Sequence, residues 1–212
     1  MNYFIQHMNM AKSKKVMVMI GAILLVATAC KKDGDPTAQE LLDGGESIAT
    51  ILTMKPADSL LGKTYLGGHI FYVNETDATG MIVSAEDVTA ATTWGCNSMN
   101  ITGADSAGIG YGAQNTSDIV QGCTDQFGAA YQCDNYVDPN GFTDWYLPSE
   151  QELLLIHTNL HMSGLGNLED DYYWSSTESQ FAGSAQHVLF NDGSVSYSNK
   201  ANTHRVRAVK NF

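Results

Sequence analysis

The sequence predicts a folded domain that combines antiparallel β-hairpins with a small number of helices. Two apolar, β-rich runs lie on either side of a polar turn at residues 74–80, and a second pair flanks Asn191-Asp192-Gly193. The Asn-Asp-Gly segment is typical of a tight hairpin turn. Between the hairpins, Ser149-Glu150-Gln151-Glu152 is a Ser-x-x-Glu capping box ahead of apolar residues at helical spacing. These three patterns indicate strands that pair locally and at least one well-defined helix.

The first half of the chain contains short elements and one long loop. Residues 39–61 carry short apolar patches broken by Gly44-Gly45 and Pro56, which predicts helical turns lying against the domain. Residues 69–73 and 81–84 form the first predicted hairpin. A stretch rich in Gly, Ser, Asn and Asp at 97–114 predicts an ordered loop, held at its start by Trp94 and Cys96. One or two short helices are expected within 115–136.

The second half begins with the capped helix, which we expect to run from about Ser149 to His161. A strand starts at 172–174, and residues 187–190 pair with 194–198 to form the second hairpin. Residues 205–209 alternate between basic and apolar side chains, which predicts one closing strand.

The charge of the chain limits its partners. It has 212 residues, with 23 acidic against 11 basic residues, and a formal net charge of −12. Between Lys63 and Arg205 the only basic residue is Lys200, whereas 17 carboxylates occur there. Phosphate recognition requires clustered Lys and Arg, so the sequence argues against nucleic acid as a partner. The same acidic surface repels anionic membranes and sulfated polymers.

The N-terminus has the pattern of a lipoprotein export signal. Lys12, Lys14 and Lys15 precede an apolar run at 16–27, whose 12 residues suit a secretory signal and are too few to span a bilayer. The run ends in Val-Ala-Thr-Ala before Cys30, which resembles the lipobox cut by the lipoprotein signal peptidase. Cys30 would then be the lipidated first residue. An ordinary leader with a chance cysteine is the alternative, and Met10 is a second candidate start.

These features predict three regions: a lipoprotein signal peptide at 1–29, a lipidated tether and short helical collar at 30–62, and a domain at 63–212. The chain would contact the membrane through lipidated Cys30, in the cell envelope at the outer membrane or the cell surface.

The remaining cysteines permit one disulfide, because an exported protein reaches an oxidising compartment. Cys123 and Cys133 are ten residues apart, and a bridge between them would contribute roughly 3 kcal/mol. We favour this pair, while Cys96 with either partner stays open. The pattern does not predict a zinc site, because CxxC is absent and no His lies close to Cys123 and Cys133.

Four clusters of polar residues are candidates for chemical sites. His157 and His161 have the helical spacing of a metal pair, yet a third ligand and the Glu of a zinc protease are missing. Glu150 with Glu152 is explained by helix capping, and the acidic run 169–171 by an exposed turn. Residues 138–144 offer oxygen ligands for calcium, although Asp-Pro-Asn-Gly is also ordinary turn chemistry. We therefore predict no catalytic residue, no metal site and no cofactor, with calcium left open.

Aromatic residues are the remaining candidates for binding. The three tryptophans, Trp94, Trp145 and Trp174, could stack on sugars, but tryptophans beside Pro or in strands more often belong to the core.

Six motifs in the same order resemble the Lcl C-terminal domain family, which closes the Legionella collagen-like adhesin. The motifs lie at 62–68, 94–96, 112–116, 144–149, 173–178 and 205–209. The segments Trp-Tyr-Leu-Pro-Ser, Trp-Ser-Ser-Thr-Glu and Val-Arg-Ala-Val are also similar to the Fibrobacter succinogenes major paralogous domain. More distantly, they are similar to the formylglycine-generating enzyme and the C-type-lectin-like fold. The resemblance implies a compact α+β domain of C-type-lectin-like type, with mainly antiparallel strands, few helices and long loops.

The expected function is recognition or adhesion by a lipid-anchored envelope protein that is not an enzyme, with a glycan or a protein as ligand. The paired active-site cysteines of the enzyme relatives have no counterpart in this pattern. The sulfated glycans associated with the adhesin require basic residues that this chain lacks. The alternatives are a structural subunit of a surface assembly and a hydrolase of envelope polymers.

Overall fold

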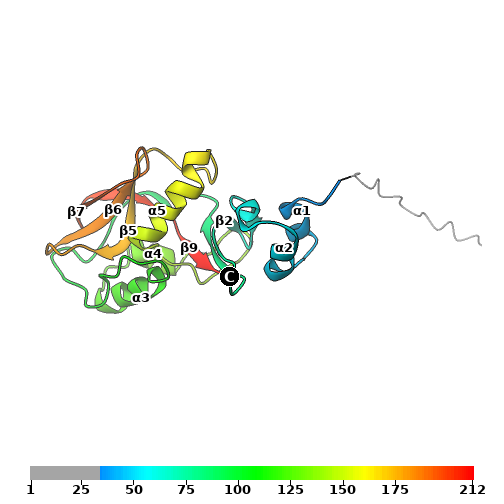
Figure 1. Cartoon of the computed structure of the whole chain (residues 1–212). Coiled ribbons are helices and arrows are strands. Elements are labelled where there is room, and N and C mark those ends of the chain that lie inside the picture. Colours follow the sequence, from blue (N-terminus) through cyan, green and yellow to red (C-terminus); the bar gives the residue numbers. More distant parts are fainter. Residues whose placement is uncertain (1–33) are drawn as a thin grey trace, which may run out of the picture. The chain divides into compact units, whose positions relative to one another are not determined.

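The computed structural model describes residues 34–212, and residues 36–212 form one compact unit. The predicted leader and lipidation site at Cys30 lie outside the described residues. Short helices and two sheets make up the unit (Figure 1). The expected α+β fold, with mainly antiparallel strands, few helices and long loops, is confirmed.

The helices are short and mostly lie where the sequence predicts them. The structure contains α1 (Ala38–Asp43), α2 (Ile48–Met54), α3 (Gly112–Gly122), α4 (Ala129–Asp134) and α5 (Glu150–Asn159), with 3-10 turns at Ala57–Leu60 and His161–Ser163. The predicted loop at 97–114 ends slightly early, because α3 already begins at Gly112. Apolar residues of α1, α2 and the first 3-10 turn join the main core cluster, which also contains Trp94 and Trp145.

Two sheets hold the strands. In the first, the order is β1 (Thr64–Tyr65), β2 (Gly68–Asn74), β3 (Thr79–Ser84) and β9 (Val209–Asn211). In the second it is β4 (Thr89–Thr93), β8 (Thr203–Val206), β5 (Tyr172–Glu178), β6 (Ser184–Leu189) and β7 (Ser194–Asn199). Both predicted hairpins, β2–β3 and β6–β7, are present and antiparallel. Within the described sheets, only β5 and β8 pair in parallel.

The prediction of one strand at 205–209 is wrong in its extent. The chain leaves β8 after Val206, passes through Arg207 and Ala208, and enters β9 in the other sheet. Arg207 lies at this break, and its guanidinium donates to Asp87 Oδ1 and to the backbone carbonyl oxygens of Ser84, Gly166 and Asn167. One continuous segment therefore joins the two sheets.

The predicted disulfide between Cys123 and Cys133 is also wrong. Cys96 and Cys123 form the bridge, with their Cα atoms 5.6 Å apart, a separation that fits disulfide geometry. Cys133 lies in α4, buried in the core with a free thiol. Burial, followed by the nearby charge of Asp134, raises the pKa of that thiol. Cys123 directly follows α3 and Cys133 lies inside α4, so the two side chains have different surroundings, and closeness in sequence does not bring the sulfurs together.

The capping box at Ser149 is confirmed and has a second role. Ser149 Oγ accepts from the Glu152 backbone N–H, and the Glu152 carboxylate accepts from the Ser149 N–H. Glu152 is fully buried and also accepts from the N–H groups of Gly110 and Gly112. The start of α5 thus fixes the loop that leads into α3.

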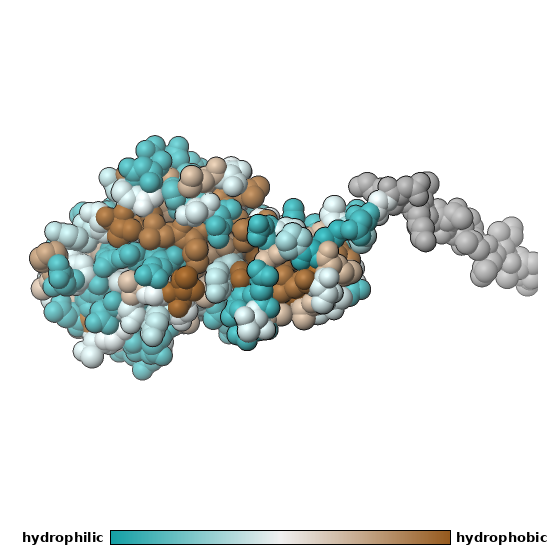
Figure 2. Space-filling view, viewed as in Figure 1, coloured by the Kyte–Doolittle hydropathy of each residue, from teal (hydrophilic) through white to brown (hydrophobic). Residues whose placement is uncertain are grey.

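The surface mixes polar and apolar areas. On the face shown in Figure 2, hydrophobic residues gather across the middle, while hydrophilic residues cover much of the margins. Across residues 34–212, each helix is too short or too polar to cross a lipid bilayer.

Candidate functional site

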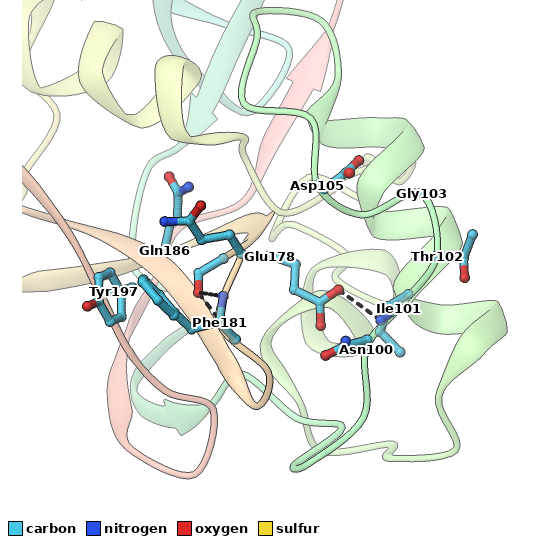
Figure 3. Close-up of a pocket in the computed structure, with 11 residues that line it drawn as sticks. Asn100, Ile101, Thr102, Gly103, Asp105, Glu178, Phe181, Gln186 and Tyr197 are labelled. Carbon is cyan, nitrogen blue, oxygen red and sulfur yellow. Dashed lines mark hydrogen bonds between the residues drawn. The ribbon is translucent and has the colours of Figure 1, made fainter.

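A cleft of about 640 Å³ lies between the β5–β7 side of the second sheet and the long loop that follows Cys96. Its lining residues are Asn100, Ile101, Thr102, Gly103, Asp105, Glu178, Ser179, Gln180, Phe181, Gln186 and Tyr197. Figure 3 shows Phe181, Gln186 and Tyr197 on one side, the loop 100–105 on the other, and Glu178 between them. The volume lies in the range typical of small-ligand sites.

Two exposed aromatic rings form one side of the cleft. The ring centroids of Phe181 and Tyr197 are 4.8 Å apart, and the planes are inclined by 37°. Tyr197 lies on β7 directly opposite Gln186 on β6, so the strand register places both side chains on the same face. The Phe181 backbone N–H donates to Ser179 Oγ, which shapes the turn that presents the ring. About half of each aromatic side chain remains accessible, 47% for Phe181 and 52% for Tyr197.

The opposite wall is held in place by a buried ion pair. Glu178 accepts from the Ile101 N–H over 2.8 Å through Oε2 and from Lys200 through Oε1. Lys200 also donates to the Met99 carbonyl oxygen and lies 4.2 Å from the centroid of the Trp94 ring. With the disulfide at Cys96, these contacts anchor the loop at several points, so its backbone is ordered before any ligand arrives.

Gly103 is needed at the bend of this wall. Its φ is +95°, a conformation that side chains rarely adopt. A Cβ atom there would also lie 2.5 Å from the Asp118 carboxylate. A larger residue at this position would therefore strain the backbone and force the Asp118 carboxylate to move.

Many polar side chains around the cleft have unused hydrogen-bonding capacity. Within residues 34–212, the side chains of Asn100, Thr102, Asp105, Gln180 and Tyr197 make no hydrogen bond to the protein. The side-chain oxygen of Gln186 is buried and also lacks a partner. Buried polar atoms are normally satisfied, so this oxygen indicates a position that a ligand hydroxyl or a water could occupy.

The charges of the cleft favour some ligands over others. No basic residue lines it, whereas Asp105 and Glu178 both do. The carboxylate of Glu178 is already bound through both oxygens, which leaves it poorly placed to exchange a proton with a substrate. The arrangement is suited to binding through stacking and hydrogen bonds, and it disfavours anionic ligands.

Basic residues near the C-terminus do not form an open positive patch. Each contacts a carboxylate: Lys200 with Glu178, Arg205 with Asp87 and Asp171, Arg207 with Asp87, and Lys210 with Asp144. These side chains are from 0% to 24% exposed.

The other face of the same sheet carries a second aromatic cluster. The His187 and His204 rings stack with centroids 4.7 Å apart, and Tyr172 packs on both. Ser198 Oγ lies 3.5 Å from His187 Nε2 and 3.2 Å from His204 Nε2. Burial, followed by the neighbouring His204, lowers the pKa of His187 to about 4. Burial also lowers the pKa of His204. Burial therefore favours the neutral form of both imidazoles.

The histidines and tryptophans considered from the sequence do not line the cleft. The His157 ring packs edge-on against Phe190, the His161 ring lies tilted against it, and His161 also contacts Asp170. The three tryptophans, Trp94, Trp145 and Trp174, are at most 2% exposed and donate their indole N–H groups to backbone carbonyls, as expected for core residues.

The acidic clusters have mainly structural contacts. Asp138 is buried and its Oδ1 accepts from the N–H groups of Asn140 and Phe142, which closes the turn at 138–142. Among the described residues, no group of three or more His, Cys, Asp or Glu side chains has the arrangement of a metal site.

Sequence reasoning missed the residues of the cleft. Phe181 and Tyr197 were not singled out, although the hairpin that carries Tyr197 was predicted. Glu178 ends the motif at 173–178, whose family resemblance does not reveal its place in the cleft. One signal was present in the sequence: Lys200 is the only basic residue in a long acidic stretch, which is typical of a side chain with a specific partner.

Two sheets, long loops and a preformed cleft define a strand-dominated α+β domain with a loop-lined cleft. The chain belongs to the Lcl C-terminal domain family, whose profile matches residues 84–210. This range contains all the residues that line the cleft. Family membership indicates an adhesin-like domain. A comparison with curated proteins finds no match.

Proposed function

We propose that this protein is a non-enzymatic recognition protein of the cell envelope, which is anchored by lipid at Cys30 and binds its ligand in the cleft. The observation that supports this proposal most strongly is the preformed cleft, in which exposed aromatic rings face polar side chains that make no hydrogen bonds to the described part of the fold. The adhesin-like family domain supports a role in attachment. The lipobox-like sequence before Cys30 supports display on a membrane.

Ligand binding is tested by applying the full-length protein, in detergent micelles, to an array of glycans and matrix proteins. We expect binding to at least one ligand and a loss of that binding in Tyr197→Ala. Phe127→Ala is the matched control, because Phe127 is 79% exposed and does not line the cleft. The absence of binding, combined with a stable homo-oligomer, would instead favour the structural-subunit alternative.

The anchor is tested separately with Cys30→Ser. A thioether to lipid requires the cysteine sulfur, so this variant should leave the detergent phase in a Triton X-114 partition, while the unmodified sequence stays in it. Unchanged partitioning of the variant would contradict lipid anchoring and leave the binding proposal intact.

Catalysis is excluded as a role for the cleft if bound oligosaccharides are recovered intact. Incubation with the array ligands, followed by mass spectrometry, should give no cleavage products. Cleavage that Asp105→Asn abolishes would favour the hydrolase alternative.

A further inference from the structure

Three features of the cleft indicate a class of ligand: its charge, its aromatic pair and its polar side chains without hydrogen-bond partners within residues 34–212. This inference rests on the proposed function, in which the cleft binds a ligand. We propose that the cleft bounded by Phe181, Tyr197, Gln186 and the loop 100–105 binds an uncharged oligosaccharide, with one sugar ring stacked on the aromatic pair.

The aromatic pair supplies the surface for stacking. The C–H groups on one face of a pyranose carry partial positive charge, and the face of an aromatic ring is electronegative. Phe181 and Tyr197 come from two different segments and lie next to each other at the edge of the cleft, half exposed (Figure 3). Exposing two adjacent aromatic rings costs solvation free energy, which contact with a ligand would recover.

Polar groups across the cleft match sugar hydroxyls. A hydroxyl both donates and accepts, and so does a side-chain amide or hydroxyl. Asn100, Thr102, Gln180 and Gln186 provide such groups, while Asp105 accepts only. The buried, unpartnered oxygen of Gln186 lies beside Tyr197 in the strand register, close to where a stacked ring would place its hydroxyls.

The charges of the cleft disfavour anionic sugars. Among residues 34–212, the cation beside the cleft is Lys200, which is fully buried and paired with Glu178, so it cannot compensate a sulfate or carboxylate. Asp105 remains uncompensated, and the chain carries a formal net charge of −12. Repulsion persists over ~8 Å at physiological salt. Although β7 is the edge strand of its sheet, the polar groups that line the cleft belong mainly to side chains, which favours a sugar over a peptide that pairs as an added strand.

The rigid loop wall favours this ligand class further. Sugar ligands offer little apolar surface, so their binding depends on keeping ordering costs low. The Cys96–Cys123 bridge and the hydrogen bonds from Ile101 and Lys200 to Glu178 fix this wall in advance.

The test compares neutral polymers with sulfated ones, and dextran and dextran sulfate differ only in their sulfate groups. Fluorescently labelled full-length protein is applied to immobilised dextran and dextran sulfate, agarose and carrageenan oligosaccharides, and mannan. We expect binding to at least one neutral polymer and at least tenfold weaker binding to its sulfated counterpart. Phe181→Ala and Tyr197→Ala should each weaken neutral binding at least fivefold, Tyr197→Phe less than twofold, and Phe127→Ala not at all.

Several results would overturn the inference: no binding to any of the neutral polymers, equal or stronger binding to the sulfated ones, or binding that Phe181→Ala leaves unchanged. Urea melts of each variant exclude unfolding as the cause, since both rings are exposed. If the protein binds a matrix protein on the array but none of these neutral polymers, the proposed recognition function stands and the oligosaccharide assignment fails. If it binds neither, both fail.

Discussion

The Cys96–Cys123 bridge should account for much of the stability of the domain. The two cysteines are 27 residues apart, and the chain-entropy relation gives about 3.5 kcal/mol for closing a loop of this length. The double variant Cys96→Ser/Cys123→Ser should therefore lose about 3.5 kcal/mol in the free energy of unfolding, measured by urea melts. The matched control is Cys133→Ala, which removes one buried sulfur and leaves the bridge; it should lose about 1 kcal/mol.

Peptide mapping of the unreduced protein identifies the pairing directly. Trypsin is unsuitable, because no cleavage site lies between Lys63 and Lys200 and one peptide would hold all three cysteines. Cleavage before aspartates separates them, at Asp105, Asp118 and Asp125. We expect peptide 87–104 linked to peptide 118–124, and an unlinked peptide 125–133. A link between the last two peptides, or loss of the bridge in Cys133→Ala, would refute the reasoning.

Three further outcomes are expected. Ser149→Ala should lower the free energy of unfolding, measured in urea melts, by about 1–2 kcal/mol, because the hydroxyl caps α5 and also donates to the Gly108 carbonyl oxygen. A loss of only a few tenths of a kcal/mol would mean that the cap contributes little. Because the pKa of His187 falls from 6.5 to about 4 on folding, the unfolded chain binds more protons between these values. Stability should therefore decline as the pH falls from 6.5 to 4, by up to about 3 kcal/mol, and His187→Gln should flatten this dependence; an equal slope in the variant would contradict the assignment. Heparin-agarose should not retain the protein at physiological salt or below, since the C-terminal cations are paired with carboxylates. Retention that weakens steeply with added salt would contradict this expectation, because it would show an exposed positive surface.

Local signals in the sequence were sufficient for the locally formed elements. The box at Ser149, the hairpin turn at 191–193 and the polar turn at 74–80 depend on neighbours in the chain, and all three are confirmed. Strand β4 was missed, because Thr-Ala-Ala-Thr-Thr lacks both large apolar residues and strict alternation. Its position depends on pairing with β8, more than a hundred residues later.

The cleft could not be predicted for a similar reason. Its two walls come from residues near 100 and near 180–197, and nothing in either segment alone indicates the other. The disulfide prediction was wrong for the same reason, because a short loop favours pairing Cys123 with Cys133, whereas the fold places Cys96 beside Cys123. Fold class and family could be predicted from short motifs, while the site required the tertiary arrangement.

The segment that passes from β8 to β9 has a consequence for the order of folding. β8 lies between β4 and β5, and β9 lies beside β3, so neither sheet is complete until the last ten residues are available. The hairpins β2–β3 and β6–β7 can form early from local contacts, but the pairing of Met81 with Asn211 closes a loop of 130 residues. Such non-local topologies fold on the order of milliseconds to seconds. During synthesis the chain would hold two incomplete sheets with unpaired strand edges, and both sheets would be completed only when the C-terminal segment docks.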